Sequence, residues 1–305
     1  MKPRLAISGG AGLLAVNWAI QMRDMWDVHL LLHHRKIAIP GVTCHMVDIS
    51  TADTAGRVIN RLSPDLVINS VALTDVDQCE RDRELATQCN VTVAANMALA
   101  AKATGSKFVQ ISTDHLFDGT KPLRSETDQP SPANHYGKTK WQAEKVVAET
   151  LAESLIIRTN FFGWGPSYRP SFSDWILGAL ENGQPVNMFT DAYYTPVYMP
   201  NLIEAVHALF AAGQSGVFNI VGGERLSKYQ FGKRLSRVFG CDESLIRPTL
   251  LSQMSDLVPR PLDMSLSNDK LLSTNAVVMP DLSTMLETLA ADRPVADLLA
   301  GIDSK

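Results

Sequence analysis

The sequence lacks long apolar runs and has little excess charge of either sign. No stretch approaches the roughly 20 consecutive apolar residues that a transmembrane helix needs. The formal net charge of -4 gives no basic pattern for a nucleic-acid polymer or an anionic membrane. We therefore expect neither a nucleic acid nor a membrane among the partners.

Cysteine is also scarce. The chain has four cysteines, and no two of them are spaced as C-x-x-C. Thiols so spaced favour a reducing compartment over a disulfide or zinc framework. Met1 leads directly into a strand-like segment, without the charged and then apolar regions of a secretion signal. Together these features predict a cytoplasmic protein.

The chain does contain a regular alternation of short apolar segments and helical ones. This alternation predicts an α/β fold, a Rossmann-like doubly wound parallel sheet. Strands are expected at residues 4–8, 28–32, 44–49, 65–69, 108–111, 155–158, 186–188 and 217–220. Helices are expected at about residues 13–25, 51–62, 84–104, 133–153, 172–181, 201–212, 228–239 and 281–299.

The alternation becomes irregular after residue 160, where a segment rich in glycine, proline and aromatic residues begins. We expect residues 1–160, with about 196–221, to form an NAD(P)-binding Rossmann domain. Residues about 161–195, with 222–305, are expected to form a smaller C-terminal substrate-binding lobe, with the substrate held between the two.

A glycine motif, Gly9-x-x-Gly12-x-x-Ala15, follows the first predicted strand and opens the first predicted helix. In this context Gly9 permits a tight turn, Gly12 lets a pyrophosphate approach the backbone, and the small Ala15 lets helix pack on strand. The N–H groups at the helix start, including those of Leu13 and Leu14, would face the phosphates. The motif predicts a dinucleotide cofactor.

The segment after the second predicted strand indicates which dinucleotide is bound. No acidic residue lies between Asp27 and Asp48 to bind a ribose 2′-hydroxyl, whereas Arg35 and Lys36 could meet a 2′-phosphate. We therefore predict NADPH, with NADH left open; the alternative is an ordinary solvated basic loop. The predicted cofactor contacts beyond the glycine turn are His34, Arg35, Asp48, Ile49, Ser70, Val71, Ala72, Tyr136 and Lys140.

Tyr136 and Lys140 are four residues apart on a predicted helix, so they share one face. An ammonium beside a phenol lowers the phenol pKa toward the range useful for proton transfer. Thr113, at the end of a neighbouring predicted strand, would add a hydroxyl, and the three side chains could polarise and protonate a carbonyl. The alternative is a tyrosine and a lysine packed together on the surface.

Taken together, these segments resemble the extended short-chain dehydrogenase/reductase superfamily and, within it, the dTDP-4-dehydrorhamnose reductase family. The resemblance implies hydride transfer from NAD(P)H to C4 of a nucleotide-linked 4-keto-6-deoxysugar. Tyr136 would be the proton donor, Lys140 would lower its pKa and hold the nicotinamide ribose, and Thr113 would hydrogen-bond the carbonyl. The matching segments are the glycine motif and residues 74–77, 112–119, 136–140, 157–161, 191–196 and 260–263.

The chain departs from the family pattern at several positions that look like substrate contacts. It has His115 where the family usually has tyrosine, Phe161 in place of a tryptophan, and Tyr194 in place of a glycine. The family's Mg²⁺-bridged dimer uses a carboxylate where residues 16–18 are not acidic, so no metal is predicted and a homodimer is left open. The substrate contacts implied are Asp114, His115, Asn160, Phe161, Tyr194 and Arg260.

Two other functions compete with a reductase. A sugar-nucleotide epimerase or dehydratase of the same superfamily is one, although dehydratases have glutamate where this chain has His115. The other is a non-catalytic NADP-binding regulatory subunit, like the β subunit of methionine adenosyltransferase. The altered residues at 115 and 161 motivate that alternative.

Overall fold

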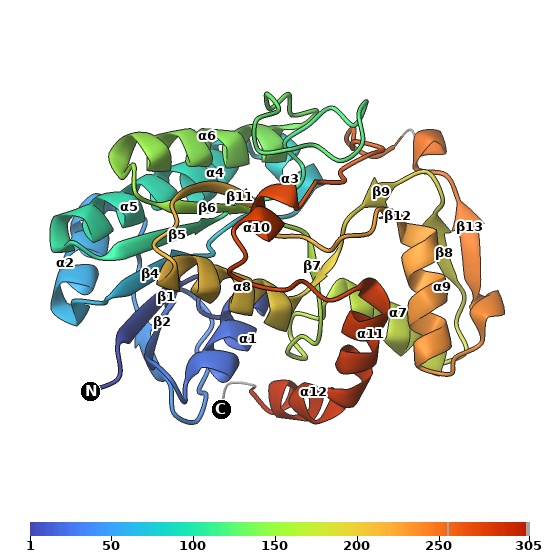
Figure 1. Cartoon of the computed structure of the whole chain (residues 1–305), viewed down its shortest axis with the longest axis horizontal. Helices are drawn as coiled ribbons and strands as arrows, with labels where there is room; N and C mark the ends of the chain where they lie inside the picture. The colour runs from blue at the N-terminus through green and yellow to red at the C-terminus, as the bar shows by residue number, and fades with distance from the viewer. Residues whose placement is uncertain (255, 303–305) are drawn as a thin grey trace.

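A seven-stranded parallel sheet organises the computed structural model, which describes residues 1–254 and 256–302 (Figure 1). Its order is β11-β6-β5-β4-β1-β2-β3, so the chain reverses direction across the sheet between β1 and β4. This confirms the predicted Rossmann-like parallel sheet. The strands are β1 (Arg4–Ser8), β2 (Asp27–Leu32), β3 (Thr43–Met46), β4 (Leu66–Asn69), β5 (Lys107–Ile111), β6 (Leu155–Arg158) and β11 (Gly216–Asn219).

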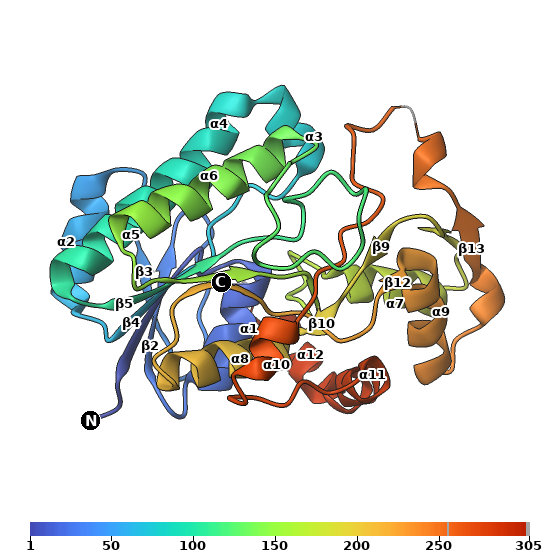
Figure 2. The same cartoon turned by 45° about the horizontal axis from the view of Figure 1, so that its top comes forward.

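Helices cover both faces of this sheet, which is why its central strands are apolar and buried on both sides. Helices α2, α5 and α6 lie on one face, while α1 and α8 lie on the other (Figure 2). The bounds are α1 (Leu13–Met22), α2 (Ala52–Leu62), α5 (Val93–Thr104), α6 (His135–Thr150) and α8 (Met199–Ala211). No helix among residues 1–254 and 256–302 is long and apolar enough to cross a bilayer.

Most of the remaining elements gather beside the carboxyl ends of the strands, at the right of Figure 1, while the short helix at Asp269–Ser273 lies near the centre, against β11. They form three two-stranded sheets with helices packed around them. The strands are β7 (Phe161–Phe162) with β10 (Val197–Tyr198), β8 (Val186–Phe189) with β13 (Ile246–Thr249), and β9 (Tyr193–Tyr194) with β12 (Leu226–Ser227). The helices are α7 (Phe172–Glu181), α9 (Lys228–Val238), α10 (Asp269–Ser273), α11 (Leu282–Ala291) and α12 (Arg293–Ala300), with short 3₁₀ turns at Glu243–Leu245 and Leu251–Gln253. Ser255 and residues 303–305, which fall in the predicted second lobe, lie outside the described residues.

Two predicted helices are wrong in detail, for different physical reasons. The helix predicted over 281–299 is two helices, because Pro294 is tolerated in the first turn of α12 but would break a continuous helix. The helical region around 84–104 already begins with α3 (Val76–Arg81) and α4 (Arg83–Thr87). A π-helical segment, Gln88–Thr92, then joins α4 to α5.

That π-helical segment has a structural function. It directs the Asn90 side chain inward, where its oxygen accepts a hydrogen bond from the Leu73 N–H at 2.7 Å. Its amide nitrogen donates to the Thr139 hydroxyl at 2.9 Å. Asn90 thereby ties the turn after β4 to helix α6, the helix that carries Tyr136 and Lys140. The distortion of the helix fixes two walls of the candidate site relative to each other.

Candidate active site

The carboxyl ends of β1, β4 and β5 open into a cavity of about 1020 Å³. In open α/β sheets this edge, at the point where the strand order reverses, is where ligands bind. The predicted site residues that line the cavity are Gly9, Gly12, Leu13, Leu14, His34, Arg35, Ser70, Val71, Ala72, Thr113, Asp114, His115, Tyr136, Lys140, Asn160 and Phe161.

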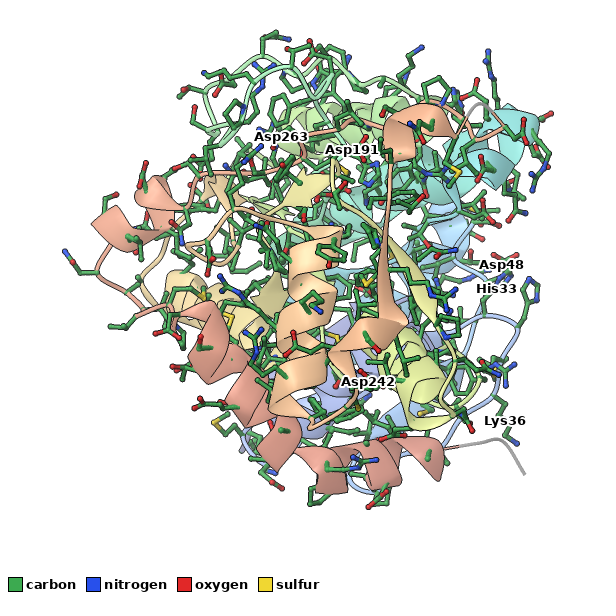
Figure 3. The ribbon with its side chains drawn as sticks, turned by 90° about the vertical axis from the view of Figure 1, so that its right-hand side faces the viewer. His33, Lys36, Asp48, Asp191, Asp242 and Asp263 are labelled. Carbon is green, nitrogen blue, oxygen red and sulfur yellow. The ribbon has the colours of Figure 1, made fainter. Side chains whose placement is uncertain are left out.

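Four predicted site residues do not line this cavity. The Asp48 carboxylate is exposed and lies 3.9 Å from His33 (Figure 3). Ile49 is buried in the core formed with α2 and α5. Tyr194 is buried as well, and Arg260 pairs with an aspartate on α3 at 2.6 Å. None of these four side chains lines the cavity, so their ligand contacts stay predictions.

The glycine turn leaves room for a ligand against the backbone. Gly9 has φ +74°, a conformation that L side chains rarely adopt, and a Cβ on Gly12 would lie 2.9 Å from the Gly9 carbonyl oxygen. Gly12 is also the N-cap of α1, so no side chain satisfies the first N–H groups of that helix. These donors and the helix dipole fit the pyrophosphate of a dinucleotide.

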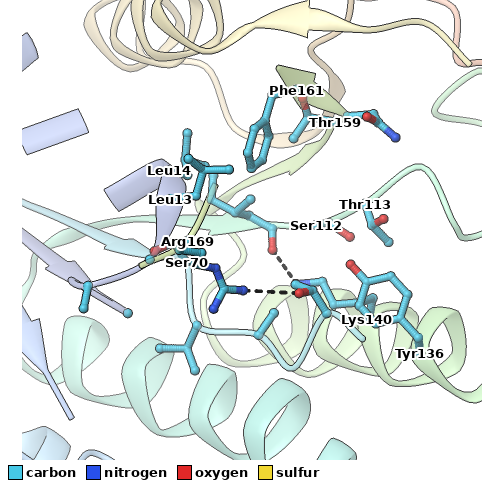
Figure 4. Close-up of a pocket in the computed structure, with 18 of the residues that line it drawn as sticks. Leu13, Leu14, Ser70, Ser112, Thr113, Tyr136, Lys140, Thr159, Phe161 and Arg169 are labelled. Carbon is cyan, nitrogen blue, oxygen red and sulfur yellow. Dashed lines mark hydrogen bonds between the residues drawn. The ribbon is translucent and has the colours of Figure 1, made fainter. Parts of the chain in front are cut away.

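A segment from the second group of elements crosses this turn. The Tyr168 hydroxyl donates to the Ala11 carbonyl oxygen at 3.1 Å, and the Arg35 guanidinium lies 4.2 Å from the centre of the Tyr168 ring. Arg169 donates to the Thr74 hydroxyl at 3.4 Å (Figure 4). The sequence predicted only that this loop belongs to the substrate-binding lobe. The contacts of Tyr168 and Arg169 depend on the fold.

Thr113, Tyr136 and Lys140 lie together along the cavity, across from Leu13 and Leu14 (Figure 4). The Asn134 side chain caps α6 by accepting from the Gly137 N–H at 3.0 Å, so the helix begins at His135, one residue before Tyr136. Burial raises the pKa of Tyr136, and a hydrogen bond with Thr113 opposes that rise. The phenol is therefore protonated at neutral pH, as a proton donor must be.

Lys140 is 2% exposed, and its ammonium donates to the Ile111 carbonyl oxygen at 2.7 Å. Burial lowers the pKa of Lys140 to about 8, although the negative charge of Glu144 opposes this. Glu144 accepts hydrogen bonds from the Ser112 hydroxyl at 2.5 Å and from Arg158 at 2.8 Å. Glu144, Ser112 and Arg158 thus form a buried hydrogen-bonded network, and the charge of Glu144 favours the protonated form of Lys140.

The far end of the cavity carries the predicted substrate contacts. Asn160 donates to the Asp114 carboxylate at 2.6 Å, and the His115 ring packs edge-on against Tyr136. Burial lowers the pKa of His115, so the imidazole is neutral near pH 7. Lys228, at the start of α9, also lines this end, and the sequence analysis missed it. No motif surrounds Lys228, so no sequence signal marked it.

The described residues contain no group of three or more His, Cys, Asp or Glu side chains arranged to hold a metal ion. The polar side chains of the cavity wall include hydroxyls, an amide, one carboxylate and cations, among them Ser112, Thr113, Thr159, Asn160, Asp114, Lys140 and Lys228. Such a wall suits a ligand with many oxygen atoms.

Comparison with known proteins agrees with this geometry. A probable low-salt glycan biosynthesis reductase of Haloferax volcanii is 29% identical over 287 residues, covering 92% of this chain and 96% of that protein. A dTDP-4-dehydrorhamnose reductase of Burkholderia thailandensis is 30% identical over 252 residues, covering 77% and 84%.

Solved structures share the fold. The crystal structure of a dTDP-4-dehydrorhamnose reductase of Bacillus anthracis in complex with NADP superposes with a TM-score of 0.85 at 23% identity, covering 96% of this chain and 100% of that one. The RmlD substrate binding domain family matches residues 4–293. The chain therefore belongs to the RmlD substrate binding domain family, within the extended short-chain dehydrogenase/reductase superfamily.

Proposed function

We propose that this protein is an NADPH-dependent reductase of a nucleotide-linked 4-keto-6-deoxysugar, acting in deoxysugar or polysaccharide biosynthesis. The observation that carries the proposal is the convergence of Thr113, Tyr136 and Lys140 in one cavity with a dinucleotide-type glycine turn. Relatives that cover most of this chain bear the names of reductases of this kind. The proposal places the sugar between the sheet and the elements around α9.

The chemistry that a reduced nicotinamide supplies when bound is hydride transfer to the carbonyl carbon. In the proposed site the Thr113 hydroxyl hydrogen-bonds the carbonyl oxygen and orients it. The Tyr136 phenol gives its proton to that oxygen as negative charge develops there. The Lys140 ammonium stabilises the phenolate left behind. Asp114, His115, Asn160 and Phe161 are proposed to contact the sugar.

The same residues favour reduction over the two alternatives. Elimination of water by a dehydratase uses a carboxylic acid beside the threonine–aspartate pair, and this chain has the neutral His115 there. A regulatory subunit would not require a phenol, an ammonium and a hydroxyl to converge. We propose further that residues 1–160 with 196–221 bind the cofactor, since α8 and β11 belong to the layers of the main sheet.

The assay that tests the proposal follows NADPH consumption. Purified protein with NADPH and dTDP-4-keto-6-deoxyglucose should lose absorbance at about 340 nm as the cofactor is oxidised. Related keto-sugars with other nucleotides serve as comparison substrates. Absence of turnover with every nucleotide-linked keto-sugar, from protein that still binds NADPH, would refute the reductase assignment.

Arg35 is expected to set the preference for NADPH. Charge-assisted hydrogen bonds to a phosphate contribute about 1.5–3 kcal/mol, so Arg35→Ala should weaken NADPH binding about 10- to 100-fold. NADH binding should change less than about twofold, because NADH lacks the 2′-phosphate. Fluorescence titration of both cofactors measures the two Kd values.

Lys36→Ala is the matched control for Arg35→Ala. Lys36 is the neighbouring cation that the sequence also offered to the 2′-phosphate, but it projects outward from the loop and, unlike Arg35, does not line the cavity (Figure 3). The Lys36→Ala substitution should leave the Kd values of NADPH and NADH unchanged. If Arg35→Ala weakened NADH binding as much as NADPH binding, Arg35 would have a packing role, through its stacking on Tyr168, and no role in the choice of cofactor.

The reduction rate should fall at alkaline pH. Burial lowers the pKa of Lys140 to about 8, so its positive charge is present below that pH and is lost as the pH rises through it. We expect kcat to decrease as the pH rises, and the midpoint of this decrease to be set by the pKa of Lys140. Glu144→Gln removes the charge that holds the pKa of Lys140 up, so it should move the midpoint to lower pH. A midpoint that stays in place or rises would contradict this role for Lys140.

A further inference from the structure

The Lys228 ammonium stands apart from the other cations near the substrate end of the cavity. Arg225 pairs with Asp263 and Arg260 pairs with Asp77, each at 2.6 Å. No carboxylate of the described residues lies within ion-pair distance of Lys228. Its ammonium instead lies over aromatic rings, 3.3 Å from the centre of Tyr194 and 4.8 Å from that of Phe172.

Cation–π contacts of this kind hold an ammonium in place without satisfying its hydrogen-bond donors. Burial lowers the pKa of Lys228 to about 8, and the negative charge of Asp114 opposes this, so the side chain is charged at neutral pH. Lys228 and Asp114 line the same cavity. Lys228 therefore presents a poorly solvated, charged donor group to the cavity. Two other polar atoms of the wall, His115 Nδ1 and Thr159 Oγ1, are buried without a partner among the described residues.

The charge of Asp114 decides what Lys228 can bind. A substrate pyrophosphate beside Lys228 would also lie near Asp114, and repulsion from that carboxylate would offset the attraction. A neutral hydroxyl fits both groups, because it can accept from the ammonium and donate to the carboxylate. The Asp114 carboxylate can accept this further hydrogen bond. One of its oxygens accepts from Asn160 at 2.6 Å, while the other accepts only a long hydrogen bond of 3.3 Å from Thr113.

Resting on the proposed function, we infer that Lys228 is a specificity-determining residue that recognises the sugar hydroxyl next to the ketone. With Thr113 and Tyr136 on the carbonyl oxygen, the hydroxyl on the adjacent carbon is the next polar group of the ring. Lys228 donates to it and Asp114 accepts from it. When Thr113 turns to the substrate carbonyl, its contact with Asp114 is released for that hydroxyl. The site then prefers a hydroxylated keto-sugar over its deoxy analogue.

Lys228→Met tests the inference with two substrates, dTDP-4-keto-6-deoxyglucose and its 3-deoxy analogue. A charged hydrogen bond to a substrate hydroxyl implies a loss in kcat/KM on the order of 100-fold for the hydroxylated sugar. The 3-deoxy analogue, already poor with the wild type, should lose less than about threefold because its partner group is missing. Lys228→Arg should recover part of the activity on the hydroxylated sugar.

Two further measurements separate recognition of the hydroxyl from other roles. The Kd of dTDP alone, which has the diphosphate but no sugar, should be the same for wild type and Lys228→Met. Lys233→Met is the matched control: it lies on the same helix, but its ammonium donates to the Glu243 carbonyl away from the cavity. It should leave kcat/KM for both sugars unchanged, and both variants should keep wild-type NADPH affinity.

The outcomes are distinct. An equal loss on both sugars with a weakened Kd for dTDP would overturn the inference and assign Lys228 to the diphosphate. Full activity of Lys228→Met on the hydroxylated sugar would overturn it as well. Both of these results require wild-type turnover, so they leave the proposed reductase function intact. Failure of the wild type to oxidise NADPH with either sugar would instead refute the proposed function, and the inference with it.

Discussion

Tyr136→Phe is expected to reduce kcat for the keto-sugar by about 10²- to 10⁴-fold, the usual contribution of a positioned proton donor. The substitution removes one oxygen atom and keeps the ring, whose contacts with His115 and with the core beside α3 are apolar. NADPH affinity should therefore stay within about twofold of the wild type. Steady-state kinetics and a fluorescence titration measure the two effects.

Thr113→Val provides the comparison for Tyr136→Phe. It removes the hydroxyl that orients the carbonyl but keeps the phenol, so we expect a smaller loss, about 10- to 100-fold. A thermal melt of each variant checks that the fold is kept. If Tyr136→Phe retained more than a tenth of wild-type kcat, the proton would have another donor, and the assignment of Tyr136 would be wrong.

The largest effect on stability is expected from Glu144→Leu. Glu144 and Arg158 are each about 4% exposed, and the guanidinium donates to the carboxylate through both Nε and Nη2. Removing the carboxylate leaves a buried, uncompensated charge, which costs about 3–5 kcal/mol in the free energy of unfolding. Urea denaturation measures this change.

The double variant Glu144→Leu/Arg158→Met distinguishes a lost ion pair from a damaged core. Because it removes both charges and keeps apolar volume, it should recover stability to within about 1–2 kcal/mol of the wild type. Arg57→Ala, which breaks an exposed pair with Asp53 on α2, should cost less than about 1 kcal/mol. A double variant less stable than Glu144→Leu alone would mean that Arg158 has a stabilising role independent of Glu144.

The sequence by itself determined the features that depend on neighbouring residues. The glycine motif specified a turn because only small residues fit its backbone, and the Tyr136–Lys140 spacing specified one helix face because an α-helix turns every 3.6 residues. Alternating apolar and helical segments specified the parallel sheet, since strands covered on both faces must be apolar throughout. Asn134, the cap of α6, follows the same local logic.

Only the tertiary structure decided which distant residues share the cavity. Lys228 reaches it because β12 pairs antiparallel with β9, which sets the start of α9 against Tyr194. Tyr168 reaches the glycine turn across 157 residues of sequence. Such contacts depend on strand order and on the path of loops, and residue periodicity carries no information about either. The sequence therefore identified the groups that are proposed to act on the carbonyl, while the fold added Lys228, which is proposed to contact the sugar.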